Sequence, residues 1–176
     1  MNDRPHSGAP FADAAGIPRP GDDERFMREA FEEGRLAADH GDVPIGAVIV
    51  RDGAIVARAG NRREVDADPT AHAEVIAIRE AARVLGRWRL SDCALYVTVE
   101  PCAMCAGAAV LARIGLVVFG APDEKAGAIK SRAELLDASW MNHHPRWRYY
   151  PQLSDQIERL LSDFFAAQRK GRSEAD

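Results

Sequence analysis

The spacing of hydrophobic and polar residues along the chain predicts where the helices lie. From residue 26 to residue 40, apolar side chains recur every three or four positions, and the residues between them are mostly charged. This period is typical of an amphipathic helix, and Asp22 or Asp23 can cap its N-terminus. A similar apolar face near the end of the chain predicts a last helix, which Ser154 caps and which ends near Arg169.

Two further helices are expected in the middle of the chain. One runs from residue 71 to residue 85, with Thr70 as its N-cap and Gly86 as its C-terminal stop. The other runs from Pro101 to about Arg113, because a proline at the first helical position loses no hydrogen bond.

Short apolar runs rich in β-branched residues predict four strands, at residues 44–50, 54–57, 95–99 and 116–119. The turn that joins the first two contains Asp-Gly, which is typical of an antiparallel hairpin. The later strands alternate with helices, and this order favours parallel pairing through right-handed crossovers. The expected fold is α/β, with a mixed sheet of four or five strands between helical layers.

Composition narrows the class of protein. The chain has 176 residues, of which 47% are apolar and 28% charged, which is ordinary for one globular domain. Three cysteines are too few for a disulfide scaffold, and no apolar run approaches the roughly 18 residues of a membrane span. We expect a cytoplasmic protein with one domain at 22–170, a disordered tail at 1–21 and a short tail at 171–176. The net charge of −4 argues weakly against nucleic-acid binding.

Two motifs at predicted helix starts carry candidate chemistry. Cys102 and Cys105 are three residues apart, so on a helix their thiols face the same side, where the helix dipole favours thiolate. His72, at the start of the preceding helix, adds an imidazole. Two thiolates and one imidazole suit zinc, and three protein ligands leave a fourth position for water, as in catalytic zinc sites. Cys93 stands apart from both motifs.

Glu74 follows His72 by two residues. At that spacing its carboxylate can approach a metal-activated water without being a ligand, and can carry a proton from the water to a substrate nitrogen. The pattern His-x-Glu followed by Pro-Cys-x-x-Cys is the signature of zinc-dependent nucleobase deaminases, and both halves are present here.

The resemblance extends beyond these two motifs. From about residue 25 to residue 170, the chain resembles the bacterial tRNA adenosine deaminases of the TadA family, within the zinc-dependent cytidine and deoxycytidylate deaminase superfamily. The strings that carry it are GDVPIGAV at 41–48, DPTAHAE at 68–74, LYVTVEPCAMCAGA at 95–108, VFGA at 118–121, NH at 142–143 and LSDFF at 161–165. The resemblance implies the cytidine-deaminase-like three-layer α/β/α fold with a mixed sheet of about five strands. It also implies a homodimer with one zinc ion per subunit, and conversion of adenosine to inosine at wobble position 34 of a tRNA anticodon stem-loop.

Roles for particular residues follow from the same resemblance. The zinc ligands match His72, Cys102 and Cys105, and the proton shuttle matches Glu74. The substrate-binding positions match Asn61, Pro44 and the backbone of Ala73. Positions near the RNA match Arg113, Asp123, Lys125 and Phe165. The alternative for these four is solvated surface charge and, for Phe165, core packing on the last helix.

Two stretches depart from the family pattern, namely the loop at 62–66 and residues 144–152, where the family usually has an apolar strand. The second departure leaves the fifth strand and the C-terminal RNA contacts open. Its aromatic residues Trp147, Tyr149 and Tyr150 could stack on bases, but packing against the last helix is the favoured interpretation.

Three functions stay open on the sequence. The leading one is deamination of adenosine 34 in tRNA. The second keeps the zinc chemistry but acts on a free base or nucleoside such as guanine or cytosine, which the departure at 144–152 and the acidic net charge would favour. The third is a zinc-stabilised RNA-binding module without catalysis, which Glu74 disfavours because a structural zinc site needs no unliganded carboxylate.

Overall fold

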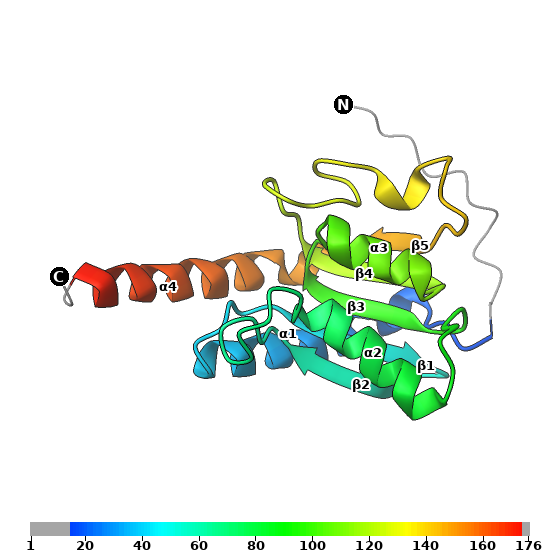
Figure 1. Ribbon diagram of the computed structural model, residues 1–176, viewed down its shortest axis with the longest axis horizontal. Coiled ribbons are helices and arrows are strands. Elements are labelled where there is room, and N and C mark those ends of the chain that lie inside the picture. Colours follow the sequence, from blue (N-terminus) through cyan, green and yellow to red (C-terminus); the bar gives the residue numbers. More distant parts are fainter. Residues whose placement is uncertain (1–14, 174–176) are drawn as a thin grey trace.

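One mixed sheet forms the centre of the molecule in the computed structural model, which describes residues 15–173 (Figure 1). Its strands are β1 (Gly46–Arg51), β2 (Ala54–Gly60), β3 (Ala94–Val99), β4 (Leu116–Ala121) and β5 (Arg146–Tyr149). They lie in the order β2-β1-β3-β4-β5, with β1 antiparallel to both of its neighbours and β3, β4 and β5 parallel. The predicted sheet and its opening hairpin are confirmed.

Helices cover both faces of this sheet (Figure 1). They are α1 (Asp23–Asp39), α2 (Ala73–Leu85), α3 (Ala103–Leu111) and α4 (Ser154–Ser173), with short 3₁₀ turns at Pro20–Asp22, Leu135–Asp137 and Pro151–Leu153. Helices α2 and α3 cover one face, and α1 with the start of α4 covers the other. The result is the three-layer α/β/α fold of the cytidine-deaminase-like proteins. None of the helices within residues 15–173 has the length and hydropathy needed to cross a membrane.

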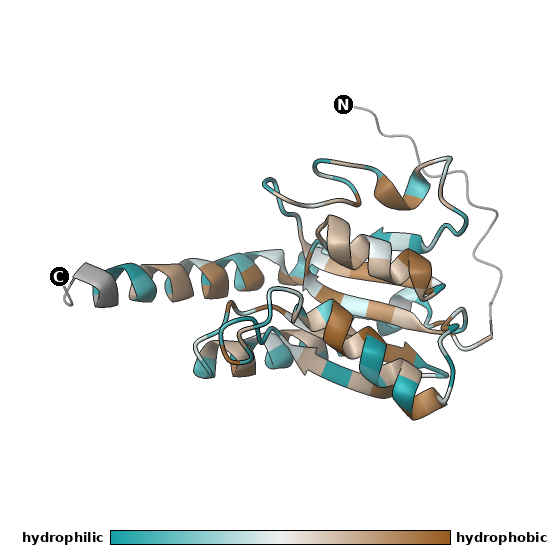
Figure 2. Ribbon diagram, viewed as in Figure 1, coloured by the Kyte–Doolittle hydropathy of each residue, from teal (hydrophilic) through white to brown (hydrophobic). Residues whose placement is uncertain are grey.

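The alternation of side chains along the strands divides the core in two. Val48 and Val50 pack with α1, whereas Ile49 between them packs with α2 and α3. Every residue of β3 and β4 is buried, because both faces of these central strands are covered. Figure 2 shows the central strands as the most apolar part of the sheet.

Helix α4 projects beyond the body of the domain (Figure 1). Its first turns are anchored by Ile157, which is 1% exposed and packs with α1, while Phe165 further along is 42% exposed. The helix begins at Ser154, as predicted, and continues to Ser173, beyond the predicted end at Arg169.

The two helices that carry the cysteine and histidine motifs begin later than predicted. Thr70 does not cap α2, because its backbone N–H and its hydroxyl both donate to Asp68 Oδ1, each at 2.7 Å. The N-cap of α2 is His72, and the N-cap of α3 is Cys102; both have extended backbone. Gly86 does stop α2, in the left-handed conformation at φ +64° that glycine adopts without strain.

The departing segment 144–152 does form a strand. Within β5, the rings of Trp147 and Tyr149 lie 6.0 and 5.5 Å from the ring of Phe119, on the face covered by α3. The expectation that these two aromatic residues pack against the last helix is therefore wrong. Of the three, only Tyr150 packs on the side of α1 and α4.

Residues 1–14 of the tail predicted at 1–21 lie outside the described residues. The residues after it contact the domain, since the backbone N–H of Asp52 donates to Gly16 O at 2.9 Å and Ile17 packs against the core beside α1. The last residues, 174–176, are also outside the described part.

Candidate active site

The strand order gathers the predicted site residues at one edge of the sheet. Because β1 is antiparallel to its neighbours, its start lies at the same edge as the ends of β2, β3 and β4. Pro44 precedes β1, Asn61 follows β2, Cys102 comes shortly after β3, and Asp123 comes shortly after β4. The N-termini of α2 and α3 open at this edge.

Three side chains meet there in a geometry that suits a metal ion. His72 Nδ1 lies 3.8 Å from Cys102 Sγ and 3.5 Å from Cys105 Sγ, and the three ligand atoms all lie within 4.8 Å of one another. Tetrahedral zinc with ordinary Zn–N and Zn–S bonds separates a nitrogen and a sulfur ligand by about 3.6 Å. The donor set and its spacing therefore fit zinc without rearrangement, and this group could hold a metal.

Electrostatics favour thiolate at Cys102. Hydrogen bonds from Cys105 and His72 lower the pKa of Cys102 to about 3, and the bond between the two cysteines raises the pKa of Cys105. Hydrogen bonding to Cys102 also raises the pKa of His72. Cys93 is different because it lies outside the group of possible metal donors, and burial raises its pKa to about 12. Cys102 and Cys105 are therefore the cysteines whose position suits a metal ligand.

Glu74 lies in the first turn of α2, two residues past His72, and is only 4% exposed. Its Oε2 is sealed from solvent and has no hydrogen-bond partner within the described residues. Burial raises the pKa of Glu74, and the carboxyl group also interacts with Cys105. Glu74 thus has a raised pKa and a buried oxygen without a hydrogen-bond partner, next to the metal-donor group. These properties suit a group that transfers protons.

A second buried glutamate precedes the cysteine motif, and the sequence analysis assigned no role to it. Glu100 is 2% exposed, and its carboxylate accepts hydrogen bonds from the backbone N–H groups of Asp123, Ile129, Lys130 and Ser131 at 2.7 to 3.2 Å, and from the Ser131 hydroxyl. Burial by itself raises the pKa of Glu100, but the hydrogen bonds from Ser131 and the backbone hold it below its usual value.

These bonds fold the loop after β4 against the cysteine motif. Gly127 forms a β-bridge with Cys102, and Ala128 N donates to Pro101 O at 2.9 Å. A Cβ at Gly127 would overlap the carboxyl group of Glu100, so a glycine is required for this close approach. Glu100 therefore holds the wall of the site rather than reacting in it.

The residues matched to the substrate pocket are all buried at this edge. Asn61 is 4% exposed, Ala73 is fully buried, and Pro44 is buried at the start of the hairpin. The backbone N–H of Asn61 donates to Ile45 O at 2.9 Å, which fixes the chain at the end of β2.

The four residues matched to RNA contacts are scattered. Asp123 and exposed Lys125 lie in the loop beside the cysteine motif, where Asp123 Oδ1 accepts the Lys125 N–H at 2.9 Å. Arg113 lies beyond the far end of α3, about 14 Å of helix from Cys102, and bonds to Asn142. Phe165 lies on the projecting part of α4. The structure brings only the first two next to the site.

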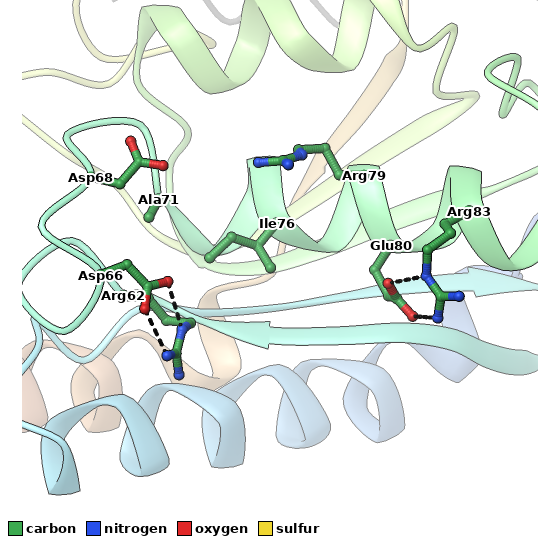
Figure 3. A pocket seen from close by; sticks show the side chains of 8 residues that line it. All are labelled: Arg62, Asp66, Asp68, Ala71, Ile76, Arg79, Glu80 and Arg83. Atoms are coloured by element: carbon green, nitrogen blue, oxygen red, sulfur yellow. Dashed lines mark hydrogen bonds and ion pairs between the residues drawn. The ribbon is translucent and has the colours of Figure 1, made fainter.

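An open cavity of about 350 Å³ lies on the outer side of α2, beside the loop after Asn61 (Figure 3). It is lined by Arg62, Asp66, Asp68, Ala71, Ile76, Arg79, Glu80 and Arg83. Two of its guanidinium groups are neutralised, since Arg62 binds Asp66 and Arg83 binds Glu80 through paired hydrogen bonds. The cavity contains none of the metal-donor residues, so it is separate from the candidate active site.

Fold and donor set together define a deaminase, and known proteins agree. A model of the MafB19-like deaminase family matches residues 21–169. A tRNA-specific adenosine deaminase of Aquifex aeolicus (strain VF5) is 46% identical over 142 residues, which cover 81% of this chain and 93% of that protein. The chain therefore belongs to the family of tRNA-specific adenosine deaminases, as its motifs predict.

Solved structures show the same fold. A structure from a study of A-to-I editing by tRNA:A34 deaminases superimposes with a TM-score of 0.75 at 41% identity, covering 78% of this chain and 99% of that one. A guanine deaminase from Nitrosomonas europaea superimposes with a TM-score of 0.70 at 25% identity, covering 94% and 98%. The chain thus shares its architecture with deaminases of different substrates.

Proposed function

We propose that this protein is a zinc-dependent enzyme that hydrolyses adenosine 34 of a tRNA anticodon to inosine, with release of ammonia. The observation that carries the proposal is Glu74, a buried carboxyl group with an open oxygen beside three metal-donor side chains. Membership of the tRNA-specific adenosine deaminases supplies the substrate class.

His72, Cys102 and Cys105 would hold the zinc ion. When bound, zinc supplies Lewis acidity, which makes a water molecule nucleophilic near neutral pH. The N-termini of α2 and α3 both point at this place and favour the negative charge that develops there.

Glu74 moves the proton in this mechanism. Its Oε2 accepts a proton from the attacking water and delivers it to the adenine ring, and a second transfer protonates the amino group that leaves as ammonia. The raised pKa suits this work, because the carboxyl group must both take up and release a proton. Asn61, Pro44 and the Ala73 backbone hold the base unstacked from the anticodon loop.

We further propose that the enzyme is a cytoplasmic homodimer that binds the anticodon stem-loop, with one zinc ion per subunit. The proposed RNA contacts are Arg113, Asp123, Lys125 and Phe165. Lys125 has the strongest structural support, because it is exposed next to the cysteine motif.

One alternative substrate class has an observation in its favour. The guanine deaminase of Nitrosomonas europaea superimposes on 94% of this chain, so the same fold serves a free-base substrate in that protein. A free-base deaminase would use the same donor set and the same glutamate. A non-catalytic zinc module would leave Glu74 without a role.

The deciding measurement is mass spectrometry of nucleosides from tRNA incubated with the protein, alongside an assay of free guanine and free cytosine. We expect inosine in the tRNA and no turnover of either free base. Guanine turnover without inosine would move the assignment to a free-base deaminase.

Salt dependence tests the RNA contacts. Each phosphate contact to single-stranded RNA contributes roughly −0.7 to the slope of log affinity against log salt concentration. Lys125→Gln should weaken tRNA binding and flatten this slope by about that amount, with zinc content unchanged. Arg113→Gln, beyond the far end of α3, should weaken binding and flatten the slope in the same way. An unchanged slope in this variant would remove Arg113 from the proposed RNA contacts.

A further inference from the structure

Asp42 is a buried carboxylate at the edge of the sheet where the candidate active site lies, and no role described so far includes it. It is 0% exposed and lies between the end of α1 and the start of β1. Asn61 follows β2, which pairs with β1 through Gly46 and Gly60. This pairing brings the two side chains together, and Asn61 Nδ2 donates to Asp42 Oδ1 at 3.2 Å.

The same carboxylate holds the loop that follows Asn61. The backbone N–H of Glu64 donates to Asp42 Oδ1 and that of Val65 donates to Asp42 Oδ2, both at 3.1 Å. These residues belong to the loop at 62–66, which departs from the family pattern. One buried group therefore ties the Asn61 side chain and this loop to the start of the sheet.

The loop at 62–66 is also connected to the metal-donor group. Arg62 N donates to Ala71 O at 3.0 Å, one residue before His72. The side chains of Arg62 and Asp66 brace the loop from outside with two hydrogen bonds of 2.8 and 2.9 Å (Figure 3). A substitution of Asp42 should therefore affect the position of Asn61 and, through the loop at 62–66, the backbone next to His72.

Hydrogen-bond chemistry then fixes which way the Asn61 amide points. An ionised carboxylate only accepts hydrogen bonds, so the NH₂ group of Asn61 must face Asp42. The amide oxygen is turned away from the carboxylate, and within the described residues no group donates to it. An amide at this position without Asp42 could rotate and exchange its acceptor for a donor.

We propose that Asp42 is a positioning residue for nucleoside recognition: it fixes the amide of Asn61 and the loop at 62–66, and it acts on the substrate only through them. This inference rests on the proposed function, in which Asn61 contacts the flipped nucleoside. Asp42 itself is sealed from the pocket by its complete burial.

A double-mutant cycle of Asp42→Asn and Asn61→Ala tests the inference, with kcat/KM measured on an anticodon stem-loop. The amide at position 42 keeps one acceptor oxygen and replaces the other with an NH₂ group, so it cannot accept from all three N–H donors together. We therefore expect kcat/KM to fall by about tenfold, mainly through KM. In the Asn61→Ala background the same change should have little further effect, because the group that Asp42 positions is gone. Equal losses in both backgrounds would overturn the proposal.

Asp23→Asn is the matched control. Asp23 is also a buried carboxylate, 4% exposed, but it bonds to Tyr96 and Arg148 on the opposite face of the sheet. Its substitution should lower the melting temperature and leave KM unchanged. Asp42→Glu keeps the acceptor and should recover part of the lost kcat/KM, which a purely structural role would not produce.

An NMR measurement separates failure of this inference from failure of the proposed function. In the wild-type protein, the side-chain NH₂ group of Asn61 should exchange slowly with water, and in Asp42→Asn it should exchange at least tenfold faster. This readout needs no substrate. Slow exchange in both proteins would overturn the role of Asp42, whereas absence of inosine with the wild-type enzyme would overturn only the assigned substrate.

Discussion

Two buried glutamates each lie two residues from a metal-donor side chain, Glu74 after His72 and Glu100 before Cys102, and their surroundings are opposite in kind. Glu100 is surrounded by five hydrogen-bond donors from one loop, and its pKa is held low. Glu74 keeps one oxygen without a partner in the described residues, and burial raises its pKa. The two side chains have the same chemistry and nearly the same exposure, 2% and 4%.

The contrast shows how to separate a structural carboxylate from a reactive one. A buried charge is costly unless hydrogen bonds or a counter-charge offset the loss of water. Glu100 meets this requirement with its own chain and is fixed. Glu74 does not, so its stabilising partner must come from what binds in the site, which is the condition for a group that exchanges protons during a reaction.

The largest expected effect comes from Glu74→Gln. The amide has the same shape but cannot shuttle a proton, so turnover should fall by at least roughly 10²–10⁴-fold. Zinc content, measured by elemental analysis, should stay near one per chain. The melting temperature should not fall, because the raised pKa means that the folded state gains nothing from ionised Glu74. Loss of zinc, or a wild-type rate, would contradict the role of proton shuttle.

The second largest effect is expected from the two cysteines of the metal-donor group. Cys102→Ser and Cys105→Ser should lower zinc content, because a hydroxyl is a poor replacement for thiolate. They should also remove the stability that zinc adds, roughly 2.7 kcal/mol at a free zinc concentration one hundred times Kd. Cys93→Ser is the control. If it lowered zinc content as much as the other two, the donor group would have to be redefined.

The smallest of the three effects is expected from Glu100→Gln. An amide keeps only one acceptor oxygen, so at least one N–H donor of the loop loses its acceptor, and the free energy of unfolding should fall by about 1–3 kcal/mol at pH 7. Glu100 has a lowered pKa in the folded state, so its stabilisation is complete above the ordinary value of 4.5 and is lost as pH falls through the folded value. Urea unfolding at pH 7 and at pH 3 should therefore show a smaller difference between the two proteins at pH 3.

Turnover of the two glutamate variants tests the comparison between Glu74 and Glu100 directly, and the unfolding measurements supply the folded fraction. Glu100→Gln should reduce turnover far less than Glu74→Gln does, provided that the folded fraction is accounted for. A loss of turnover as large as that of Glu74→Gln, in fully folded protein, would mean that Glu100 takes part in the reaction.

The main helices and strands were predictable because the spacing of their apolar residues reflects which faces are buried. The central strands read as apolar runs since both of their faces are buried, and α2 ended at Gly86 as its left-handed conformation requires. The strand β5 was harder to predict. Arg146 to Tyr149 alternate charged and aromatic side chains, but the strand has only four residues, all half-buried, and it lacks the apolar run of the central strands.

The candidate active site also contains residues that could be predicted from the sequence and residues that could not. The metal-donor group and Glu74 were predictable because their spacing along the chain directly reflects the chemistry. Asp42 and Glu100 were missed, because their partners lie 19 to 31 residues away and the contacts appear only once strand ends meet. The start of α2 was misplaced at Thr70 for a related reason, since Asp68 competes for the groups of Thr70 that would cap a helix.

The strand order has a consequence for how the chain is assembled during synthesis. After the first hairpin forms, each later strand joins a free edge of the existing sheet, β3 beside β1, then β4, then β5. No strand has to be inserted between two that are already paired. All three metal-donor residues precede β4, so the ribosome releases the complete donor set before the last two strands of the sheet have emerged.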